Sequence, residues 1–179
     1  MAGAAALTAL FTAGAWIGLS GPSLAGGSAT TISLTAKLNA AQEVPKPRAT
    51  AAARGTFAAG LVRNGTGGSL SWRLTFQGLS GKATASHVHL GKRGKAGGVA
   101  VSLCGPCRSG ARGTAKLNAK IVTALLAGGA YVNVHTAKNP AGEIRGQVAR
   151  SSAAPPPPPP STTTGGGSTG ATTYEDPYP

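Results

Sequence analysis

Short segments of alternating apolar and polar residues, separated by glycine-rich breaks, constrain the fold of this chain more than any other feature. In Ser69–Phe76 (SLSWRLTF) every second residue is large and apolar, and the residues between are Ser, Arg and Thr. Side chains of a strand alternate between two faces, so such a segment has one buried face and one solvated face. The pattern predicts an all-β fold, an immunoglobulin-like antiparallel β-sandwich or a related Greek-key sandwich. The expected strands are Thr31–Leu38, Gly55–Val62, Ser69–Gln77, Lys82–Leu90, Gly98–Leu103, Gly113–Leu117, Ala130–Thr136 and Glu143–Ala149.

One short helix is expected among the strands. Asn118 can cap it, because an asparagine side chain can accept a backbone N–H of the first helical turn. The helix is predicted to cover an open end of the sandwich with one apolar face. That face consists of Ile121, Val122, Leu125 and Leu126.

The composition of the two ends leaves room for one domain. Residues 1–29 hold an apolar run and then small residues, which is typical of a secretory signal peptide; an uncleaved anchor is the alternative. Residues 151–179 hold six consecutive prolines followed by Gly, Ser and Thr, which indicates a disordered tail. The domain is therefore expected at residues 30–150. The mature protein is expected to be secreted, periplasmic or attached to the cell envelope, with no transmembrane span.

The predicted domain is strongly basic. All seventeen Lys and Arg lie between Lys37 and Arg150, and the only acids there are Glu43 and Glu143, so the domain carries a net charge of +15. Such a charge favours anionic partners, among them acidic cell-envelope or extracellular polymers; a solvated basic surface without a partner is the alternative. A specific nucleic-acid site is not expected, because the cations are scattered and few aromatic residues are available to stack on bases.

Three segments of the chain resemble a known family. They are Leu38–Pro47 (LNAAQEVPKP), Ala85–Gly91 (ASHVHLG) and Leu125–Val148 (LLAGGAYVNVHTAKNPAGEIRGQV). Together they are similar to the CHRD domain, a module named after chordin and also found alone in secreted bacterial proteins. The resemblance covers about 120 residues and implies an extracellular, immunoglobulin-like or related β-sandwich, in a family whose molecular role is mostly uncharacterised.

The sequence departs from this family in the loop after the H-x-H motif. The family usually has a turn rich in Gly, Pro and Ala there, whereas this chain has Lys92, Arg93 and Lys95. These cations are candidates for binding an anion, and a solvated turn is the simpler alternative.

Strand alternation is expected to gather the histidines on one face of the sheet. His87 and His89 are two residues apart in one predicted strand, so their side chains share a face. Asn133 and His135 share a face of a later strand for the same reason. The three histidines of the chain could therefore converge.

A hairpin is expected to extend this polar face. With a loop over residues 137–141, His135 stands opposite Glu143 and Asn133 stands opposite Arg145. Imidazoles with one carboxylate suit copper or zinc, and the H-V-H text looks like the copper-binding strand of copper-zinc superoxide dismutases. Those enzymes use further histidines and an aspartate, and this domain contains no Asp. The candidate ligands are His87, His89, His135 and Glu143.

The same face also fits a purely structural network. In that interpretation Glu143 orients His135 by a hydrogen bond, and Arg145 pairs with a carboxylate such as Glu43. Both acids of the domain lie inside the family-like motifs, which solubility alone does not explain. The sequence leaves the metal site and the network open as alternatives. The network residues are Glu43, Asn133, Glu143 and Arg145.

The two cysteines predict a local disulfide. Cys104 and Cys107 have the C-x-x-C spacing of thioredoxins, but the strand-to-helix context of that motif is missing and a turn sequence follows. In an exported protein, a disulfide that staples a hairpin end is expected instead.

These observations predict a non-enzymatic module. The sequence has no nucleotide-binding glycine loop between a strand and a helix and no G-x-S-x-G elbow. The first expectation is a secreted or envelope-associated binding or structural protein with a basic surface. The alternative is a metal-binding or redox protein with a three-histidine site for copper or zinc.

Overall fold

The computed structural model describes residues 30–48 and 52–160. The expected signal peptide (1–29) and the end of the expected tail (161–179) lie outside the described residues. Within the described ranges, residues 151–160 follow the last strand and form no helix or strand. No helix in this part of the chain has the length and apolar character needed to cross a bilayer.

The domain is built from antiparallel strands and one short helix. In chain order the elements are β1 (Thr31–Asn39), the 3-10 turn η1 (Ala40–Gln42), β2 (Arg54–Asn64), β3 (Gly67–Gln77), β4 (Ala83–Leu90), β5 (Val99–Cys104), β6 (Ala111–Leu117), α1 (Ala119–Leu126), β7 (Ala130–Thr136), β8 (Asn139–Gln147) and β9 (Ala149–Arg150). Each of the eight expected strands is present, so the all-β antiparallel class is confirmed. The short β9 and η1 were not expected.

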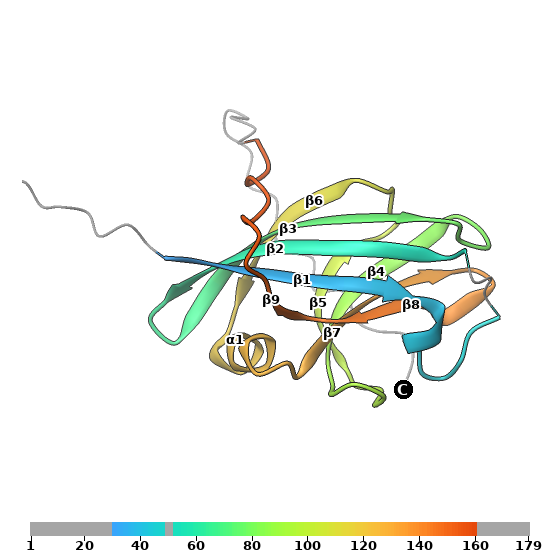
Figure 1. Cartoon of the computed structure of the whole chain (residues 1–179), viewed down its shortest axis with the longest axis horizontal. Coiled ribbons are helices and arrows are strands. Elements are labelled where there is room, and N and C mark those ends of the chain that lie inside the picture. The colour runs from blue at the N-terminus through green and yellow to red at the C-terminus, as the bar shows by residue number, and fades with distance from the viewer. Residues whose placement is uncertain (1–29, 49–51, 161–179) are drawn as a thin grey trace, which may run out of the picture.

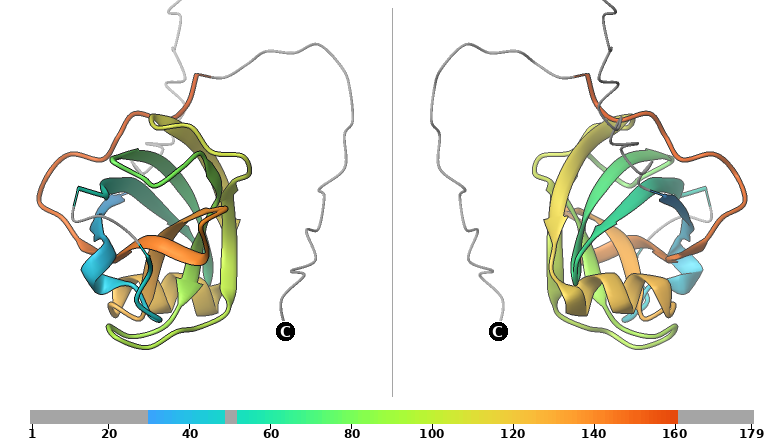
Figure 2. Two further views of the ribbon diagram at one scale, coloured as in Figure 1. Left: turned by 90° about the vertical axis from the view of Figure 1, so that its right-hand side faces the viewer. Right: turned by 90° about the vertical axis from the view of Figure 1, so that its left-hand side faces the viewer.

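The strands belong to one sheet that curls into a nearly closed barrel. Their order is β5-β4-β7-β8-β1-β2-β3-β6, with β9 paired to β1 (Figure 1). The two ends of this order, β5 and β6, come into contact with each other. Viewed end on, the two halves of the curled sheet face each other around one core, as the two layers of a sandwich do (Figure 2).

The alternation seen in the sequence decides which side chains form that core. Along β3 the apolar residues Leu70, Trp72 and Leu74 are at most 4% exposed, whereas Arg73 between them is exposed. The same alternation along β2 buries Phe57, which is 0% exposed. Because these side chains point into the barrel, the outer face of the sheet carries the polar residues of each strand.

β8 joins the two halves of the barrel at Gly146. A Cβ atom added there would lie 2.6 Å from the carbonyl oxygen of Lys37 and 3.1 Å from the nitrogen of Leu38, both backbone atoms of β1. The chains can approach this closely only because glycine has no side chain. β1 and β8 pair at a single position, Asn39 with Arg145, so this contact links the β7–β8 hairpin to β1 and β2.

The helix forms as expected. The side chain of Asn118 accepts a hydrogen bond from the backbone nitrogen of Ile121 at 3.0 Å, which caps the first turn. Ile121, Val122 and Leu125 are buried, and the helix contacts β3, β7 and β9. α1 therefore packs its apolar face against the barrel.

The hairpin between β7 and β8 is tighter than expected. Thr136 pairs with Asn139, so the turn contains only two residues in place of the expected loop over residues 137–141. The extra residues are absorbed by an irregularity in β8 before Ile144, which restores the predicted pairing of Asn133 with Arg145. This shift moves Glu143 away from its expected place.

Candidate metal centre

Strands β4 and β7 bring the three histidines together on the outer face of the barrel. His87 and His89 lie on β4, and His135 lies on the neighbouring strand β7, which pairs with β4 in antiparallel fashion. Val88, between the two β4 histidines, is 0% exposed and points into the core. The predicted convergence of the three histidines is therefore observed.

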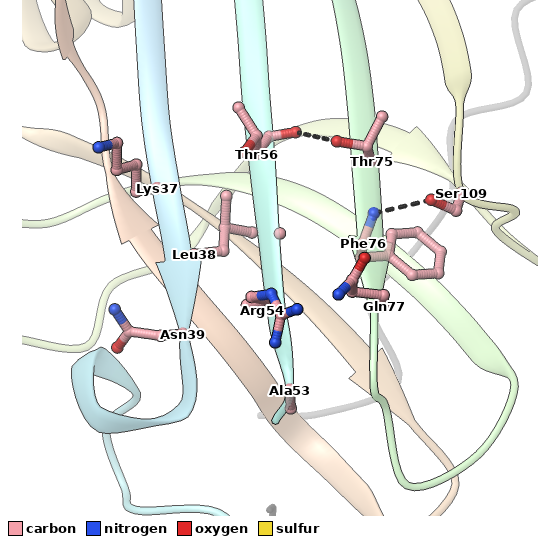
Figure 3. Close-up of a pocket in the computed structure, with 11 residues that line it drawn as sticks. Lys37, Leu38, Asn39, Ala53, Arg54, Thr56, Thr75, Phe76, Gln77 and Ser109 are labelled. Atoms are coloured by element: carbon pink, nitrogen blue, oxygen red, sulfur yellow. Dashed lines mark hydrogen bonds between the residues drawn. The ribbon is translucent and has the colours of Figure 1, made fainter. Parts of the chain in front are cut away.

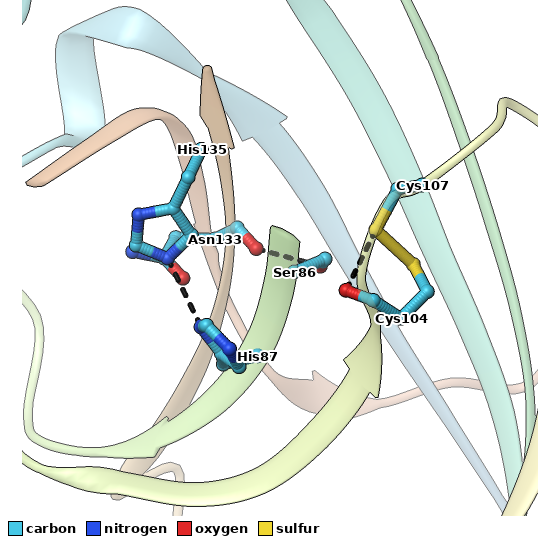
Figure 4. Close-up of a disulfide and its surroundings, with 6 residues drawn as sticks. All are labelled: Ser86, His87, Cys104, Cys107, Asn133 and His135. Carbon is cyan, nitrogen blue, oxygen red and sulfur yellow. Dashed lines mark hydrogen bonds between the residues drawn. A yellow bond between two sulfur atoms is a disulfide. The ribbon is translucent and has the colours of Figure 1, made fainter. Parts of the chain in front are cut away.

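The three rings are close enough to share one ion. One ring nitrogen of each histidine can be chosen so that all three lie within 4.8 Å of one another. Nδ1 of His87 and Nε2 of His135 are 3.1 Å apart, and these two side chains point toward each other from adjacent strands (Figure 4). The ring centroids of His87 and His89 are 5.7 Å apart.

Backbone carbonyl groups fix the tautomers of two of these histidines. Nδ1 of His89 lies 2.8 Å from the oxygen of Gly97, and Nδ1 of His135 lies 2.7 Å from the oxygen of Pro140. A carbonyl oxygen can only accept, so each Nδ1 carries the hydrogen and donates it. In a neutral ring the lone pair is then on Nε2. This is the arrangement that outer hydrogen bonds impose on metal-binding histidines.

His89 is held in the neutral form. It is 8% exposed, and burial is the main reason that its pKa is lowered. Among the smaller contributions, the Gly97 bond and nearby Asn133 raise the pKa, whereas His135 and Arg145 lower it. Nε2 of His89 and Oδ1 of Asn133 are both buried and make no well-formed hydrogen bond, although Asn133 lies close enough to His89 to raise its pKa. A buried lone pair without a donor is a group that a ligand can satisfy.

A stack of side chains continues from the histidines across β7 to β8. The Tyr131 ring is parallel to the His89 ring, with an interplanar angle of 7° and centroids 4.9 Å apart. The Arg145 guanidinium lies 3.4 Å from the centroid of the Tyr131 ring. Because the strand order is β4-β7-β8, Tyr131 stands between the other two residues. The stack keeps the His89 ring in a fixed plane.

The loop from Gly91 to Gly98 covers this face. Nη2 of Arg145, which is 1% exposed, donates to the carbonyl oxygens of Lys92 and Lys95 at 3.0 and 2.8 Å. Arg145 thus holds the loop through its backbone and leaves the side chains of Lys92 and Lys95 exposed. The side chain of Arg93 is exposed too and donates to Oε1 of Gln42 in η1. The three candidate anion-binding cations therefore lie on the solvent side of the loop.

Glu143 does not join the histidines, which corrects its place in the predicted ligand set. Its carboxylate accepts hydrogen bonds from the nitrogen and hydroxyl of Ser80, the hydroxyl of Thr136 and the amide of Asn139. Burial alone would raise its pKa, but these bonds together outweigh burial and hold the pKa below its usual value. The tight β7–β8 turn explains this placement, because it brings Asn139 and Thr136 together beside Glu143. His135 is oriented by the Pro140 carbonyl group and not by Glu143.

Glu43 packs over the same polar face from the segment after η1. A Cβ atom added to Gly142 would lie 2.5 Å from Oε2 of Glu43 and 3.0 Å from Nδ2 of Asn133, so the two side chains meet above this glycine. Burial raises the pKa of Glu43 to about 7, against the smaller opposing effects of the Val44 N–H and of Arg145. The expected hydrogen-bonded pair of Arg145 with Glu43 is not formed, since Arg145 donates to the loop carbonyl groups. Oε2 of Glu43 and Nη1 of Arg145 are buried without partners.

The motifs that meet around the histidines match one family model. Residues 34–148 correspond to the CHRD domain. The chain belongs to the CHRD family. Comparison with curated proteins and with solved structures gave no match.

The contacts show how the CHRD-like motifs of this chain meet in the folded domain. Glu43 of the Q-E-V-P segment meets Asn133 of Y-V-N-V-H-T, and Arg145 of G-E-I-R-G carries the loop that follows H-V-H. The four residues expected to form a polar network are all buried, but neither bond expected among them, Glu143 with His135 or Arg145 with Glu43, is formed. Glu143 instead accepts hydrogen bonds from Ser80, Thr136 and Asn139. Ser80 has no signal in the sequence that links it to Glu143.

The cysteines of the CHRD domain lie beside the histidine strand but are not candidate ligands. The sulfur atoms of Cys104 and Cys107 are 2.16 Å apart, and Cys104 on β5 pairs with Ser86 on β4 (Figure 4). The bond staples the end of β5 to the turn that leads to β6, as expected. Since both sulfur atoms are in the disulfide, neither is available to a metal.

Proposed function

We propose that this CHRD domain binds one copper or zinc ion through His87, His89 and His135. The observation that carries the proposal is the cluster of three ring nitrogens, one from each histidine, within 4.8 Å of one another. The carbonyl groups that hold the hydrogen on Nδ1 of His89 and His135 support it, because they leave the lone pair of each neutral ring on Nε2. Two nitrogens bound to one tetrahedral zinc lie roughly 3.4 Å apart, so small side-chain rotations suffice. Three imidazoles leave one position for water or a small anion.

The positive charges around the histidine cluster have two opposite effects on metal affinity. Arg145 and the basic loop after His89 repel a divalent cation and reduce its affinity. The charge of Arg145 also helps to lower the pKa of His89, which favours the neutral imidazole that metal binding requires. Binding through Nδ1 of His87 also requires that its proton move to Nε2, because Nδ1 stands beside the Nε2 lone pair of His135.

We propose an oxidising compartment for this site. The Cys104–Cys107 disulfide supports it, because such bonds persist mainly in secreted, periplasmic and envelope proteins. The apolar segment within residues 1–29, proposed as a signal peptide, and the proline-rich tail from residue 151 are consistent with export and attachment. The proposal is one of binding, and no catalytic residue is assigned.

The test is metal titration of the exported protein. Wild type stripped of metal is titrated with zinc and copper by calorimetry, and bound metal is counted by mass spectrometry. One ion per chain is expected, with an affinity tighter than micromolar. His87→Ala and His135→Ala should each lose it, and Lys138→Ala, an exposed residue of the β7–β8 turn, should not. Binding weaker than micromolar in wild type, or unchanged in both histidine variants, contradicts the proposal.

A second function is supported by the distribution of charge. Sixteen of the seventeen Lys and Arg are exposed, and Arg145 is the exception. Among the described residues the only acids are Glu43 and Glu143, which are 3% and 0% exposed. The described surface is thus cationic without any exposed carboxylate. We propose that the module also attaches to an anionic polymer outside the cell, as the composition suggests.

A further inference from the structure

The outer face of β1, β2, β3 and β6 carries rows of polar residues set by the strand register. In one row, Thr35 pairs with Ala58, Ala58 with Arg73 and Arg73 with Arg112. The two arginines stand directly opposite each other on neighbouring strands, and both are exposed. Like charges in this position destabilise a sheet unless an anion lies between them. The pair is therefore a place where a bound anion would be stabilising.

The next rows form a hollow on the same face. Lys37, Thr56 and Thr75 make one row, and Asn39, Arg54 and Gln77 make the other. With Ser109 they line a hollow of about 500 Å³ (Figure 3). Lys37 and Arg54 supply its positive charge. The hollow and the arginine pair lie in consecutive rows, so the four cations follow one continuous track across the sheet.

Residues 151–160, the described start of the proline-rich segment, lie across the other end of the track. A Cβ atom on Gly60 would lie 2.9 Å from Pro155, so the tail passes over β2 one row beyond Arg73. Between this crossing and the hollow, the residues beside the cations are mainly Thr, Ala and Ser. Small side chains let a polymer backbone come close to the sheet, and hydroxyl groups can donate and accept hydrogen bonds.

We infer that this track, made of Lys37, Arg54, Arg73 and Arg112, docks an extended acidic polysaccharide. The inference rests on the proposed attachment function and names its surface and ligand class. Nucleic acid is disfavoured because base stacking needs exposed aromatic rings. Trp72 and Phe57 of these strands point into the core, and Phe76, which lines the hollow, is partly buried against the core. A lipid surface is disfavoured because the one large exposed hydrophobic residue of the described chain, Val99, is on β5. The cations of the track are complementary in charge to the carboxylate groups of an acidic polysaccharide, which is therefore the favoured class of partner.

The test uses polygalacturonate as the probe and full-length secreted protein. Binding is measured by calorimetry at several salt concentrations for wild type, for Arg73→Ser/Arg112→Ser and for Lys37→Ser/Arg54→Ser. The control is Lys120→Ser/Lys138→Ser, which removes the same charge from α1 and from the β7–β8 turn. Each track variant should bind about tenfold more weakly than wild type, with a shallower salt dependence, and the control less than about twofold more weakly.

Each other outcome overturns a defined part of the inference. If wild type does not bind polygalacturonate, the track fails as a polysaccharide site, and if it does not bind single-stranded DNA either, the attachment function fails too. If wild type binds but the control loses as much as the track variants, attachment stands and the track fails. Tighter binding to single-stranded DNA or to anionic vesicles, lost in the same track variants, replaces the polysaccharide with that partner.

Discussion

The β4-β7-β8 side of the barrel and the β1-β2-β3-β6 side use the same strand alternation but treat their outer polar residues in opposite ways. On the first side a loop and Glu43 cover the polar residues, and Arg145 is 1% exposed. On the second side Arg73 and Arg112 face solvent. The groups that cover the first side fix the orientation and the tautomer of a side chain such as His89. The exposed arginines of the second side leave their positive charge available over an extended surface. One side is therefore suited to a small ion and the other to a large ligand.

The largest expected effect comes from a substitution at Gly146, where the two sides of the barrel are in contact. Gly146→Ala puts a methyl group against the β1 backbone, where no flexible side chain can yield. We expect a loss of about 3 kcal/mol in the free energy of unfolding, measured by urea denaturation. Gly81→Ala is the control, since a Cβ atom there meets nothing within 4 Å. Equal stability of the two variants would show that β8 and β1 are not held this closely.

The two buried acids should differ sharply when each is made neutral. Glu143→Gln removes the charge that accepts bonds from Ser80, Thr136 and Asn139 and turns one acceptor into a donor. We expect a cost of about 2.5 kcal/mol at pH 7, seen in urea denaturation. Glu43→Gln should cost far less under the same conditions. A larger cost for Glu43→Gln would contradict the roles given to these residues.

The pH dependence of stability should identify Glu43. Its pKa is about 7 in the folded protein, against an ordinary value of 4.5 for a solvated glutamate, so the folded form binds the proton more tightly than the unfolded chain. Wild type is therefore fully stable with respect to this group below pH 4.5, loses stability as the pH rises to 7, and changes no further above it. The stability of wild type minus that of Glu43→Gln should fall by on the order of 2 kcal/mol between about pH 4.5 and 8. The difference removes contributions common to both proteins, such as that of His89. A flat difference would be inconsistent with a buried, neutral Glu43.

The smallest expected effect concerns the exposed arginine pair on the β1-β2-β3-β6 side of the barrel. Arg112→Thr removes one of two facing cations and adds a residue that favours strands. Stability should increase by about 0.5 kcal/mol at low salt, and the gain should shrink in about 0.5 M salt, where exposed charges are screened. Arg63→Thr, near the end of β2, should show less of this salt-dependent gain. A gain that does not depend on salt would mean that the two arginines do not repel each other.

Much of the fold could be predicted because it depends on local patterns. The alternation in SLSWRLTF locates β3 and its buried face, and Asn118 with the apolar residues after it locates α1. The rule that alternate residues of a strand share a face also predicted correctly that His87, His89 and His135 converge. The disulfide was predicted from the expected export and from the missing strand-to-helix context around the C-x-x-C spacing, and it is present.

What could not be predicted depends on turn geometry and on backbone atoms. A two-residue turn after Thr136 shifts Glu143 from His135 to Ser80, and the alternation pattern alone does not specify the length of a turn. The carbonyl groups of Gly97 and Pro140 set the histidine tautomers, yet every residue has a carbonyl group, so nothing in the sequence marks these two. The contact of the basic loop with Arg145 could not be predicted either, because it is also made through backbone carbonyl groups.

The most direct test of the central claim is a nitrogen-15 correlation spectrum of the histidine rings before and after one equivalent of zinc. Without metal, His89 and His135 should carry hydrogen on Nδ1 and none on Nε2. On adding zinc, the Nε2 signals of both residues should shift while their Nδ1–H groups remain bonded to the carbonyl oxygens. Unchanged Nε2 signals, or loss of the hydrogen from Nδ1 of His89 or His135, would contradict the proposed metal centre.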